Sequence, residues 1–166
     1  MKPSHDARIV NRLEESCDIG IVDRNEVLIV EVVRSPHGHA LATALWKRLP
    51  IHATASGKLL LAHLPSAEVN EVLAQPLPAF TPHTITDPSE LRQQLALIRR
   101  QGYAMDNEEF EMGVRGVSAP IWGIDGRLVA ALGVPGPAGR ITDERASSIA
   151  SALTEAAANI SAASAG

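Results

Sequence analysis

Two strand-like runs separated by only two residues limit the topologies that this chain can adopt. The runs span residues 18–23 and 26–34, are rich in β-branched side chains and meet at Arg24-Asn25. A connection this short joins antiparallel neighbours, because parallel strands need a long crossover. The sequence therefore predicts an antiparallel hairpin and excludes a doubly wound parallel sheet.

The second run of this hairpin is apolar on both of its faces. Strict alternation divides its apolar residues into two sets of three, with Val27, Ile29 and Val33 on one side and Leu28, Val30 and Val32 on the other. A strand with two apolar faces belongs to a sheet that is covered on both sides.

The rest of the chain adds helices, one more strand and a second hairpin. Helices are expected at residues 7–16 and 57–64, from Ser66, after Asp87 and after Thr142, and strands at 103–106, 114–122 and 128–134, with 40–44 as a short strand or an extended loop. The second hairpin turns at Asp125-Gly126, a favoured tight-turn pair. These elements predict an α+β domain, in which a mostly antiparallel sheet of about six strands has helices on both faces.

Helix ends have their own signals in this sequence. Asp87-Pro88 supplies an N-cap followed by a proline suited to the first helical position, and Glu90 completes a capping box. Gly102 suits the left-handed position after the same helix. Ser66 is expected to cap the helix whose apolar stripe is Val69, Val72 and Leu73.

Composition and charge restrict the partners of the chain. Its 166 residues fit one ordinary domain, and its net charge of −4 and its 3% of aromatic residues offer neither a basic face nor a stacking platform for nucleic acid. The lone Cys17 indicates a reducing compartment. The sequence also shows no secretory signal and no apolar stretch of membrane-spanning length. We therefore expect a cytoplasmic domain that binds neither DNA nor a membrane by itself.

Small residues at 54–57 precede one of the predicted helices. They do not form a nucleotide-binding loop, because His52 stands where that motif needs its first glycine and Leu59 stands where Ser or Thr would hold magnesium. A helix that starts with small residues can instead expose unpaired N–H groups, which suit a carboxylate. Close packing of the turn is the alternative interpretation.

An acidic run at residues 106–111 follows the strand predicted at 103–106. Three interpretations are open: paired carboxylates in acid–base catalysis, one acid that contacts a ligand, or a solvated loop. Other catalytic or metal signatures are weak, because no G-x-S-x-G occurs and Cys17 has no adjacent base. The histidines considered do not follow a zinc-binding spacing: His37, His39, His52, His63 and His83. We expect no enzyme activity, no metal and no cofactor.

Three blocks carry a more specific pattern: LPIHATASGKLLLA at residues 49–62, IRRQGYAMDNEEF with GVRG at 98–116, and the stretch from Ala119-Pro120-Ile121 through Asp125-Gly126-Arg127 to Pro137. In order and spacing they closely resemble the effector domain of IclR-family transcription regulators, over nearly the whole chain. The resemblance implies a GAF-like domain that binds small metabolites, often organic acids. It further implies that residues 1–16 end an interdomain linker helix, that 17–161 form the effector-binding domain and that 162–166 are a frayed tail.

The resemblance also implies a set of pocket residues. The predicted positions are an apolar cup of Leu41, Leu49 and Val114, a carboxylate-binding turn at Ala55 and Ser56, an acid at Asp106 that accepts a hydrogen bond from a ligand hydroxyl, and three further positions at Gly116, Gly133 and Pro135. Better-known members often have small polar side chains at those last three positions. Their replacement here is expected to leave more volume and less polarity, which favours a bulky or aromatic acid.

Regulation is implied on the same basis. The intact regulator has an N-terminal winged helix-turn-helix that is missing here, and binding of the effector shifts the population of homodimers or tetramers that reach DNA only through that domain. Two alternatives remain open. A small hydrolase or isomerase that uses Asp106 with a nearby histidine predicts turnover that Asp106→Ala removes. A pure oligomerisation module predicts that no ligand binds saturably.

Overall fold

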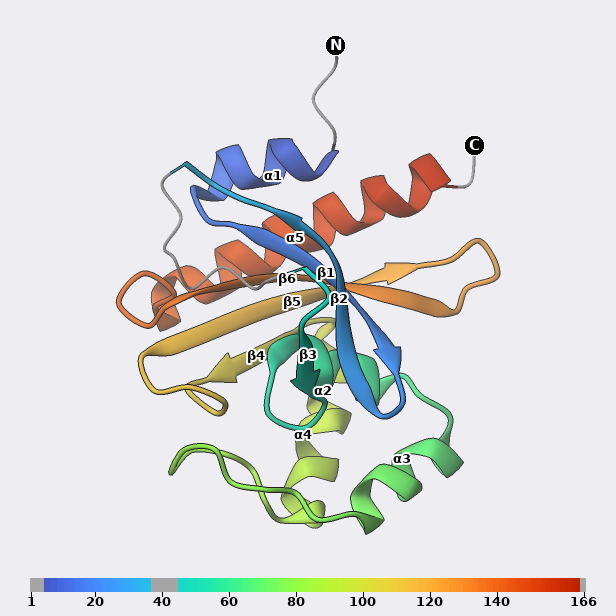
Figure 1. The fold of residues 1–166 in the computed structure, drawn as a ribbon. Helices are drawn as coiled ribbons and strands as arrows, with labels where there is room; N and C mark the ends of the chain where they lie inside the picture. The colour runs from blue at the N-terminus through green and yellow to red at the C-terminus, as the bar shows by residue number, and fades with distance from the viewer. Residues whose placement is uncertain (1–4, 37–44, 165–166) are drawn as a thin grey trace.

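The computed structural model describes residues 5–36 and 45–164. These residues form five helices and six strands (Figure 1), in the order α1 (His5–Leu13), β1 (Cys17–Asp23), β2 (Glu26–Val33), β3 (Arg48–Pro50), α2 (Ala55–Ala62), α3 (Ser66–Ala74), α4 (Pro88–Gln101), β4 (Ala104–Asn107), β5 (Val114–Trp122), β6 (Leu128–Pro137) and α5 (Asp143–Ser164). No helix within the described ranges is long and apolar enough to cross a lipid bilayer.

The six strands make one sheet in the order β3-β2-β1-β6-β5-β4, and every neighbouring pair is antiparallel. Arg24 and Asn25, between β1 and β2, both have positive φ, at 52° and 62°. Two central residues with positive φ give a hairpin turn whose twist matches that of the strands. Gly126, with φ of 78°, turns the chain between β5 and β6. Both predicted hairpins are confirmed, as is the predicted antiparallel sheet.

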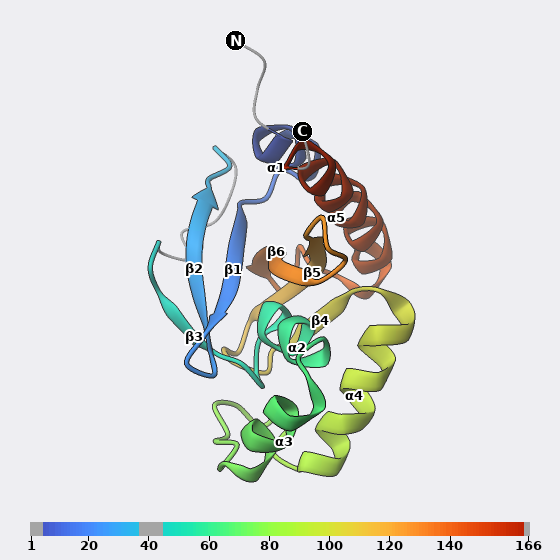
Figure 2. The same cartoon turned by 90° about the vertical axis from the view of Figure 1, so that its right-hand side faces the viewer.

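Helices cover both faces of the sheet, and each face has its own core. Figure 2 shows α1 and α5 lying together on one side, with α2, α3 and α4 gathered on the other. The first core contains the apolar side chains Ile9, Val10, Val117, Leu132, Ile149 and Leu153. The second contains Val27, Ile29, Leu59, Leu91, Leu95 and Ile98. The expected α+β, GAF-like arrangement is confirmed.

Helix α2 lies at the centre of the second core. All eight of its residues are buried, because it contacts the sheet on one side and α4 on the other. Its sequence is accordingly apolar around most of its circumference instead of along one stripe. This deep position brings the start of α2 directly against the middle strands of the sheet.

The predicted division of β2 into two faces is wrong at its C-terminal end. Val27 and Ile29 pack under α2 as expected, but Val33 packs in the core beneath α5, and Val32 joins the α2 side. The pairing of β2 with β1 skips Val30, so one extra residue is inserted in β2. A β-bulge of this kind reverses the alternation of side chains beyond it.

The cap residues at both ends of α4 agree with prediction, although no hydrogen bond from Glu90 completes the capping box among the described residues; the start of α3 does not agree. Asp87 caps α4 by accepting a hydrogen bond from the Ser89 N–H at 2.8 Å, and Gly102 adopts φ of 85°. At α3 the N-cap is Pro65, and Ser66 is the first helical residue, so the predicted serine cap is wrong. The stripe of α3 is buried as predicted.

Two segments of the chain complete the comparison with the predicted elements. Strand β3 pairs with β2 and was not predicted, because three residues that include a proline carry no strand pattern. The strand or loop predicted at 40–44 lies outside the described residues.

Candidate functional site

A cavity lies between the N-terminus of α2 and the middle strands of the sheet. Together with the solvent at its open mouth it spans about 600 Å³, of which about 80 Å³ can hold the centre of a water molecule. Eight of the nine predicted pocket residues line it: Leu49, Ala55, Ser56, Asp106, Val114, Gly116, Gly133 and Pro135. The ninth, Leu41, lies outside the described residues. The structure thus brings together residues from α2, β4, β5, β6 and the end of β3.

Two transverse rows of the sheet form the floor of this cavity. Their paired residues are Asp18–Gly133–Ser118 in the first row and Pro135–Gly116–Asp106 in the second. Residues paired across antiparallel strands point to the same face of the sheet. The middle residue of each row is a glycine, so the floor is low there. One end of each row carries a carboxyl group, which belongs to Asp18 in the first row and to Asp106 in the second.

Thr54 shapes the turn at the start of α2. Its backbone is extended, with φ of −125° and ψ of 156°, and its Oγ1 accepts a hydrogen bond from the Gly57 N–H at 3.1 Å. The same hydroxyl donates to the Pro50 carbonyl at 2.9 Å, and the Lys58 N–H donates to the Thr54 carbonyl. Of the three amides in the first turn of α2, the cap therefore satisfies that of Gly57, while the Lys58 N–H makes the first bond of the helix itself.

The two remaining amides belong to Ala55 and Ser56. Among the described residues neither N–H has an acceptor, and both residues line the cavity. On its other side the turn is tightly packed, since a Cβ at Gly57 would lie 2.5 Å from the Ile51 carbonyl oxygen. The turn thus has unpaired N–H groups on one side and close packing on the other, and carboxylate binding by those N–H groups stays a prediction.

The Ser56 hydroxyl belongs to a short hydrogen-bond chain. Ser118 Oγ donates to the Leu132 carbonyl at 3.1 Å, so its only hydrogen is committed there. The 3.1 Å contact between Ser56 Oγ and Ser118 Oγ consequently has Ser56 as donor. Ser56 can offer a ligand its backbone N–H and an oxygen lone pair, but not its hydroxyl hydrogen.

Asp106 is a buried acid at one end of the floor. Asp106 is 7% exposed, and its Oδ1 accepts a hydrogen bond from the Glu109 N–H at 2.8 Å. Burial raises the pKa of Asp106 to about 7, against the opposing effect of the Glu109 N–H and with a further increase from the negative charge of Glu109. The solvated-loop interpretation is therefore wrong for Asp106.

An ion pair that was not predicted lies beside Asp106. Lys58 Nζ is 2.8 Å from Glu109 Oε2, and the two side chains are 2% and 6% exposed. Glu109 Oε2 also accepts a hydrogen bond from the Asn107 N–H at 2.9 Å. The two charged residues are 51 positions apart, so no local sequence pattern could have paired them. The pair ties the acidic loop to α2.

The three positions expected to lack polar side chains differ in their surroundings. A Cβ at Gly116 would meet its nearest neighbours at 3.5 Å and beyond, so space for a methyl group exists there. A Cβ at Gly133 would lie 2.7 Å from Asp18 Oδ1 and 2.8 Å from Ser56 Oγ. The expectation of more volume and less polarity is therefore wrong at Gly133, because a carboxylate and a hydroxyl fill that space.

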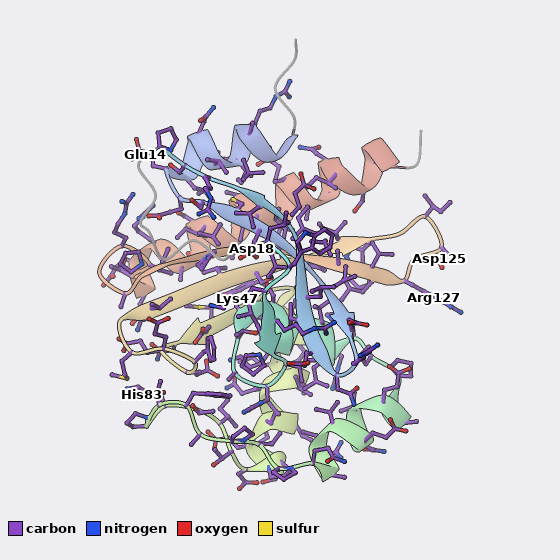
Figure 3. All side chains as sticks on the ribbon, in the orientation of Figure 1. Glu14, Asp18, Lys47, His83, Asp125 and Arg127 are labelled. Carbon is purple, nitrogen blue, oxygen red and sulfur yellow. The ribbon has the colours of Figure 1, made fainter. Side chains whose placement is uncertain are left out.

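Several lining residues were missed by sequence reasoning. They are Asp18 and Lys47, which Figure 3 labels near the middle of the view, together with Phe110, Glu111 and Arg115. Asp18 reaches the cavity through its pairing with β6, a long-range contact that no local motif records. Phe110 was visible in the acidic block, and its ring packs edge-on against Phe80 at a centroid distance of 5.1 Å.

Two of the described histidines, His52 and His63, are hydrogen-bonded away from the cavity, and His83 is exposed and does not line it. His52 Nε2 lies 2.9 Å from the Pro78 carbonyl oxygen, and His63 Nδ1 lies 2.9 Å from the Leu59 carbonyl oxygen. No group of three or more metal-ligating side chains exists within residues 5–36 and 45–164. His37 and His39 lie outside the described residues.

Comparison with known proteins identifies relatives over most of this chain. The regulator XynR of Escherichia coli is 36% identical over 146 residues, which cover 87% of this chain and 58% of that protein. BhcR of Paracoccus denitrificans is 35% identical over 158 residues, which cover 93% and 56%. Both are named as HTH-type transcriptional regulators. The chain thus spans little more than half the length of these relatives.

Solved structures agree with these relatives. The Thermotoga maritima IclR has a TM-score of 0.90 and 34% identity, and the match covers 96% of this chain and 65% of that one. An IclR homolog from Microbacterium hydrocarbonoxydans, complexed with 4-hydroxybenzoate, has a TM-score of 0.89 and 32% identity, with 97% and 65% covered. The inducer-binding domain of PobR from Acinetobacter, a double mutant complexed with 3-hydroxybenzoic acid, has 0.87 and 26%, with 95% and 93% covered.

The family comparison covers nearly the whole sequence. Residues 4–162 match the family described as the bacterial transcriptional regulator IclR C-terminal domain. This range includes the full sheet and every residue that lines the cavity. It leaves out only the first three residues of the chain and its last four, which include the C-terminal end of α5. The chain belongs to the IclR family of bacterial transcriptional regulators and matches its C-terminal domain.

Proposed function

We propose that this domain binds a small aromatic acid in the cavity above β5 and β6, and that the bound acid controls DNA binding by a helix-turn-helix domain of the whole regulator. One observation carries the proposal: the N–H groups of Ala55 and Ser56 have no acceptor among the described residues, and both residues line a cavity that also has apolar surface from Leu49, Phe110 and Val114. An acid placed there would gain two hydrogen bonds and the positive end of the α2 dipole.

Two ionisable residues of the cavity, Lys47 and Asp106, favour binding of a monocarboxylate. Lys47 is exposed at the cavity and adds a positive charge near its mouth. Asp106 has a pKa of about 7, so near neutral pH a large fraction of the molecules carry it uncharged. An uncharged Asp106 does not repel a bound carboxylate and still accepts a hydrogen bond from a ligand hydroxyl.

The walls of the cavity favour a planar, apolar ligand body. Phe110, Leu49 and Val114 contribute apolar surface, and the space above Gly116 is unfilled. Relatives at 32% and 26% identity were solved with 4-hydroxybenzoate and 3-hydroxybenzoic acid respectively. By the same chemistry, an acid of the hydroxybenzoate class suits this cavity better than a two- or three-carbon keto acid.

We further infer the place of this domain in the whole protein. Helix α1 packs on α5, and Arg12 bonds Glu155 across that contact at 3.0 Å, so the chain enters the domain on the face opposite the cavity. In this arrangement residues 1–16 end a linker helix from the DNA-binding domain. The domains pair as homodimers or tetramers, the regulator acts in the cytoplasm, and it catalyses no reaction.

Calorimetric titration tests the ligand class. The panel contains benzoate, 3-hydroxybenzoate, 4-hydroxybenzoate, pyruvate and glyoxylate, with benzamide as a neutral analogue of benzoate. We expect saturable binding of at least one benzoate and much weaker binding of benzamide. Binding of the keto acids alone would reject the aromatic class, and binding of no acid would favour a pure oligomerisation module.

A proline substitution tests the amide pair directly. Ala55 is the first helical residue, and the backbone of Thr54 already has the conformation that a residue before proline adopts. Ala55→Pro therefore removes one N–H with little effect on the fold, and we expect the affinity for benzoates to fall about tenfold or more. The matched control is Ser66→Pro at the exposed start of α3, which should leave the affinity unchanged.

A further inference from the structure

A side chain from β1 occupies the place of the side chain that β6 lacks. Asp18 of β1 is paired with Gly133 of β6, and it is 5% exposed. A Cβ built on Gly133 would lie only 2.7 Å from Asp18 Oδ1. The Asp18 carboxylate therefore lies too close for a side chain to be added at position 133 unless one of them moves.

We propose that Asp18 is a specificity-determining residue of the effector site, and that its carboxylate accepts a hydrogen bond from a hydroxyl group on the bound acid. This inference rests on the proposed function and assigns the ligand hydroxyl to Asp18 instead of Asp106. A preference for a hydroxybenzoate that Asp18→Ala leaves unchanged would return that hydroxyl to Asp106. Asp18 lines the cavity, so its carboxylate is within the same space as the two free amides of α2.

The surroundings of Asp18 favour a hydrogen-bond donor on the ligand. The Cβ position of Gly133 lies 2.7 Å from Asp18 Oδ1 and 2.8 Å from Ser56 Oγ, whose hydrogen is directed to Ser118, so these two oxygens flank Gly133 at the same corner of the cavity. A ligand hydroxyl that approaches this corner from the cavity side can donate a hydrogen bond, whereas a second carboxylate or a ketone oxygen would be repelled.

Asp18 does not need to be free of other contacts for this role. A carboxyl group has two oxygens with more than one lone pair between them, so it can accept a hydrogen bond from a ligand hydroxyl in addition to its contacts with the protein. A hydroxyl that reaches Asp18 therefore gains a hydrogen bond that benzoate cannot make.

Asp18 and Asp106 mark opposite ends of the cavity floor. Their strands, β1 and β4, are separated by β6 and β5, and three strand spacings amount to about 14 Å. A Cβ at Gly116 would approach both Ala55 and Asp106, while one at Gly133 would approach Ser56 and Asp18. Asp18 is therefore a recognition point of its own, on the Ser56 side of the amide pair.

Removal of the Asp18 carboxylate tests this assignment through the ligand. The affinities of the wild-type chain and of Asp18→Ala are measured for benzoate, 3-hydroxybenzoate and 4-hydroxybenzoate. We expect the wild type to prefer one hydroxybenzoate over benzoate by about tenfold or more, and Asp18→Ala to reduce that preference to about twofold. The affinity for benzoate itself should change little.

Two further variants separate recognition from structure and charge. Asp125→Ala removes an exposed carboxylate at the far end of the β5–β6 hairpin (Figure 3) and should keep the wild-type preference. Gly133→Ser forces Asp18 and Ser56 to move and should weaken the preference.

The outcomes distinguish this inference from the proposed function. Equal losses for benzoate and the hydroxybenzoates in Asp18→Ala would show a structural role and overturn the inference alone. A wild-type chain that binds benzoate and all hydroxybenzoates equally would overturn it too. A wild-type chain that binds no acid would overturn the proposed function and this inference together.

Discussion

Lys58 and Glu109 join helix α2 to the loop after β4 in the interior of the protein, with 2.8 Å between Nζ and Oε2. The Glu109 N–H also donates to Asp106 Oδ1, so this single residue connects the ion pair to the acid of the cavity floor. Position and charge at this end of the cavity therefore depend on one buried pair. Its energetics can be tested apart from any ligand.

Loss of Lys58 should destabilise the fold strongly. Lys58→Met leaves the Glu109 carboxylate buried without its cation, and we expect the free energy of unfolding in urea to fall by about 3–5 kcal/mol. Lys58→Met combined with Glu109→Leu removes both charges and should recover much of that loss. The exposed pair Arg12–Glu155 is the matched control, and Arg12→Ala should cost far less. Similar losses for the two cations would contradict the prediction.

Asp106 should make the stability of the domain depend on pH. Its pKa rises from 3.8 to about 7 on folding, so the unfolded chain loses the proton first and stability falls as the pH rises through this range. Asp106→Asn does not titrate and keeps the acceptor for the Glu109 N–H. Between about pH 5 and pH 8 the wild type should lose roughly 2–3 kcal/mol relative to this variant in urea unfolding. An equal pH dependence of both proteins would refute the assignment.

Alanine at two glycines near the cavity should have different effects: one substitution lowers stability, and the other weakens ligand binding. A Cβ at Gly57 meets the Ile51 carbonyl oxygen at 2.5 Å, so Gly57→Ala should lower the free energy of unfolding by about 1–3 kcal/mol. Gly116→Ala makes only ordinary contacts and should change it by less than about 1 kcal/mol. It fills part of the cavity, however, and should weaken the binding of benzoates in calorimetric titration. Tight binding by a stable Gly116→Ala chain would place the ligand elsewhere.

The cap of α2 should contribute to stability through a hydroxyl group alone. Thr54→Ala removes the bonds to the Gly57 N–H and to the Pro50 carbonyl, and it should cost about 1–2 kcal/mol in thermal or urea unfolding. Thr54→Ser retains the oxygen at the same position and should cost much less. If Ser and Ala were equally destabilising, the methyl group and not the cap would be responsible.

Local signals in the sequence predicted local structure well. The turn at Arg24-Asn25, the cap at Asp87 and the left-handed Gly102 each depend on a few neighbouring residues, and each has the predicted form. The faces of β2 were assigned wrongly beyond Val30, because a bulge depends on the pairing with β1 and not on the strand's own pattern.

The site was predicted in the same uneven way. Ala55, Ser56 and Asp106 lie in segments whose pattern is visible in the sequence, and the structure places them on one cavity. Asp18 and the Lys58–Glu109 pair are brought there by contacts between distant segments. Such contacts depend on strand order and helix position, which no single segment encodes.

Side-chain alternation along β1 has a consequence for how this domain can respond. Asp18 faces the cavity, while Cys17 and Ile19, immediately before and after it, lie in the opposite core with Ile9 and Val10 of α1. An occupant that displaced Asp18 would therefore move the same short stretch of backbone that carries Cys17 and Ile19. Only one peptide bond separates a residue of the cavity wall from a residue that packs against α1.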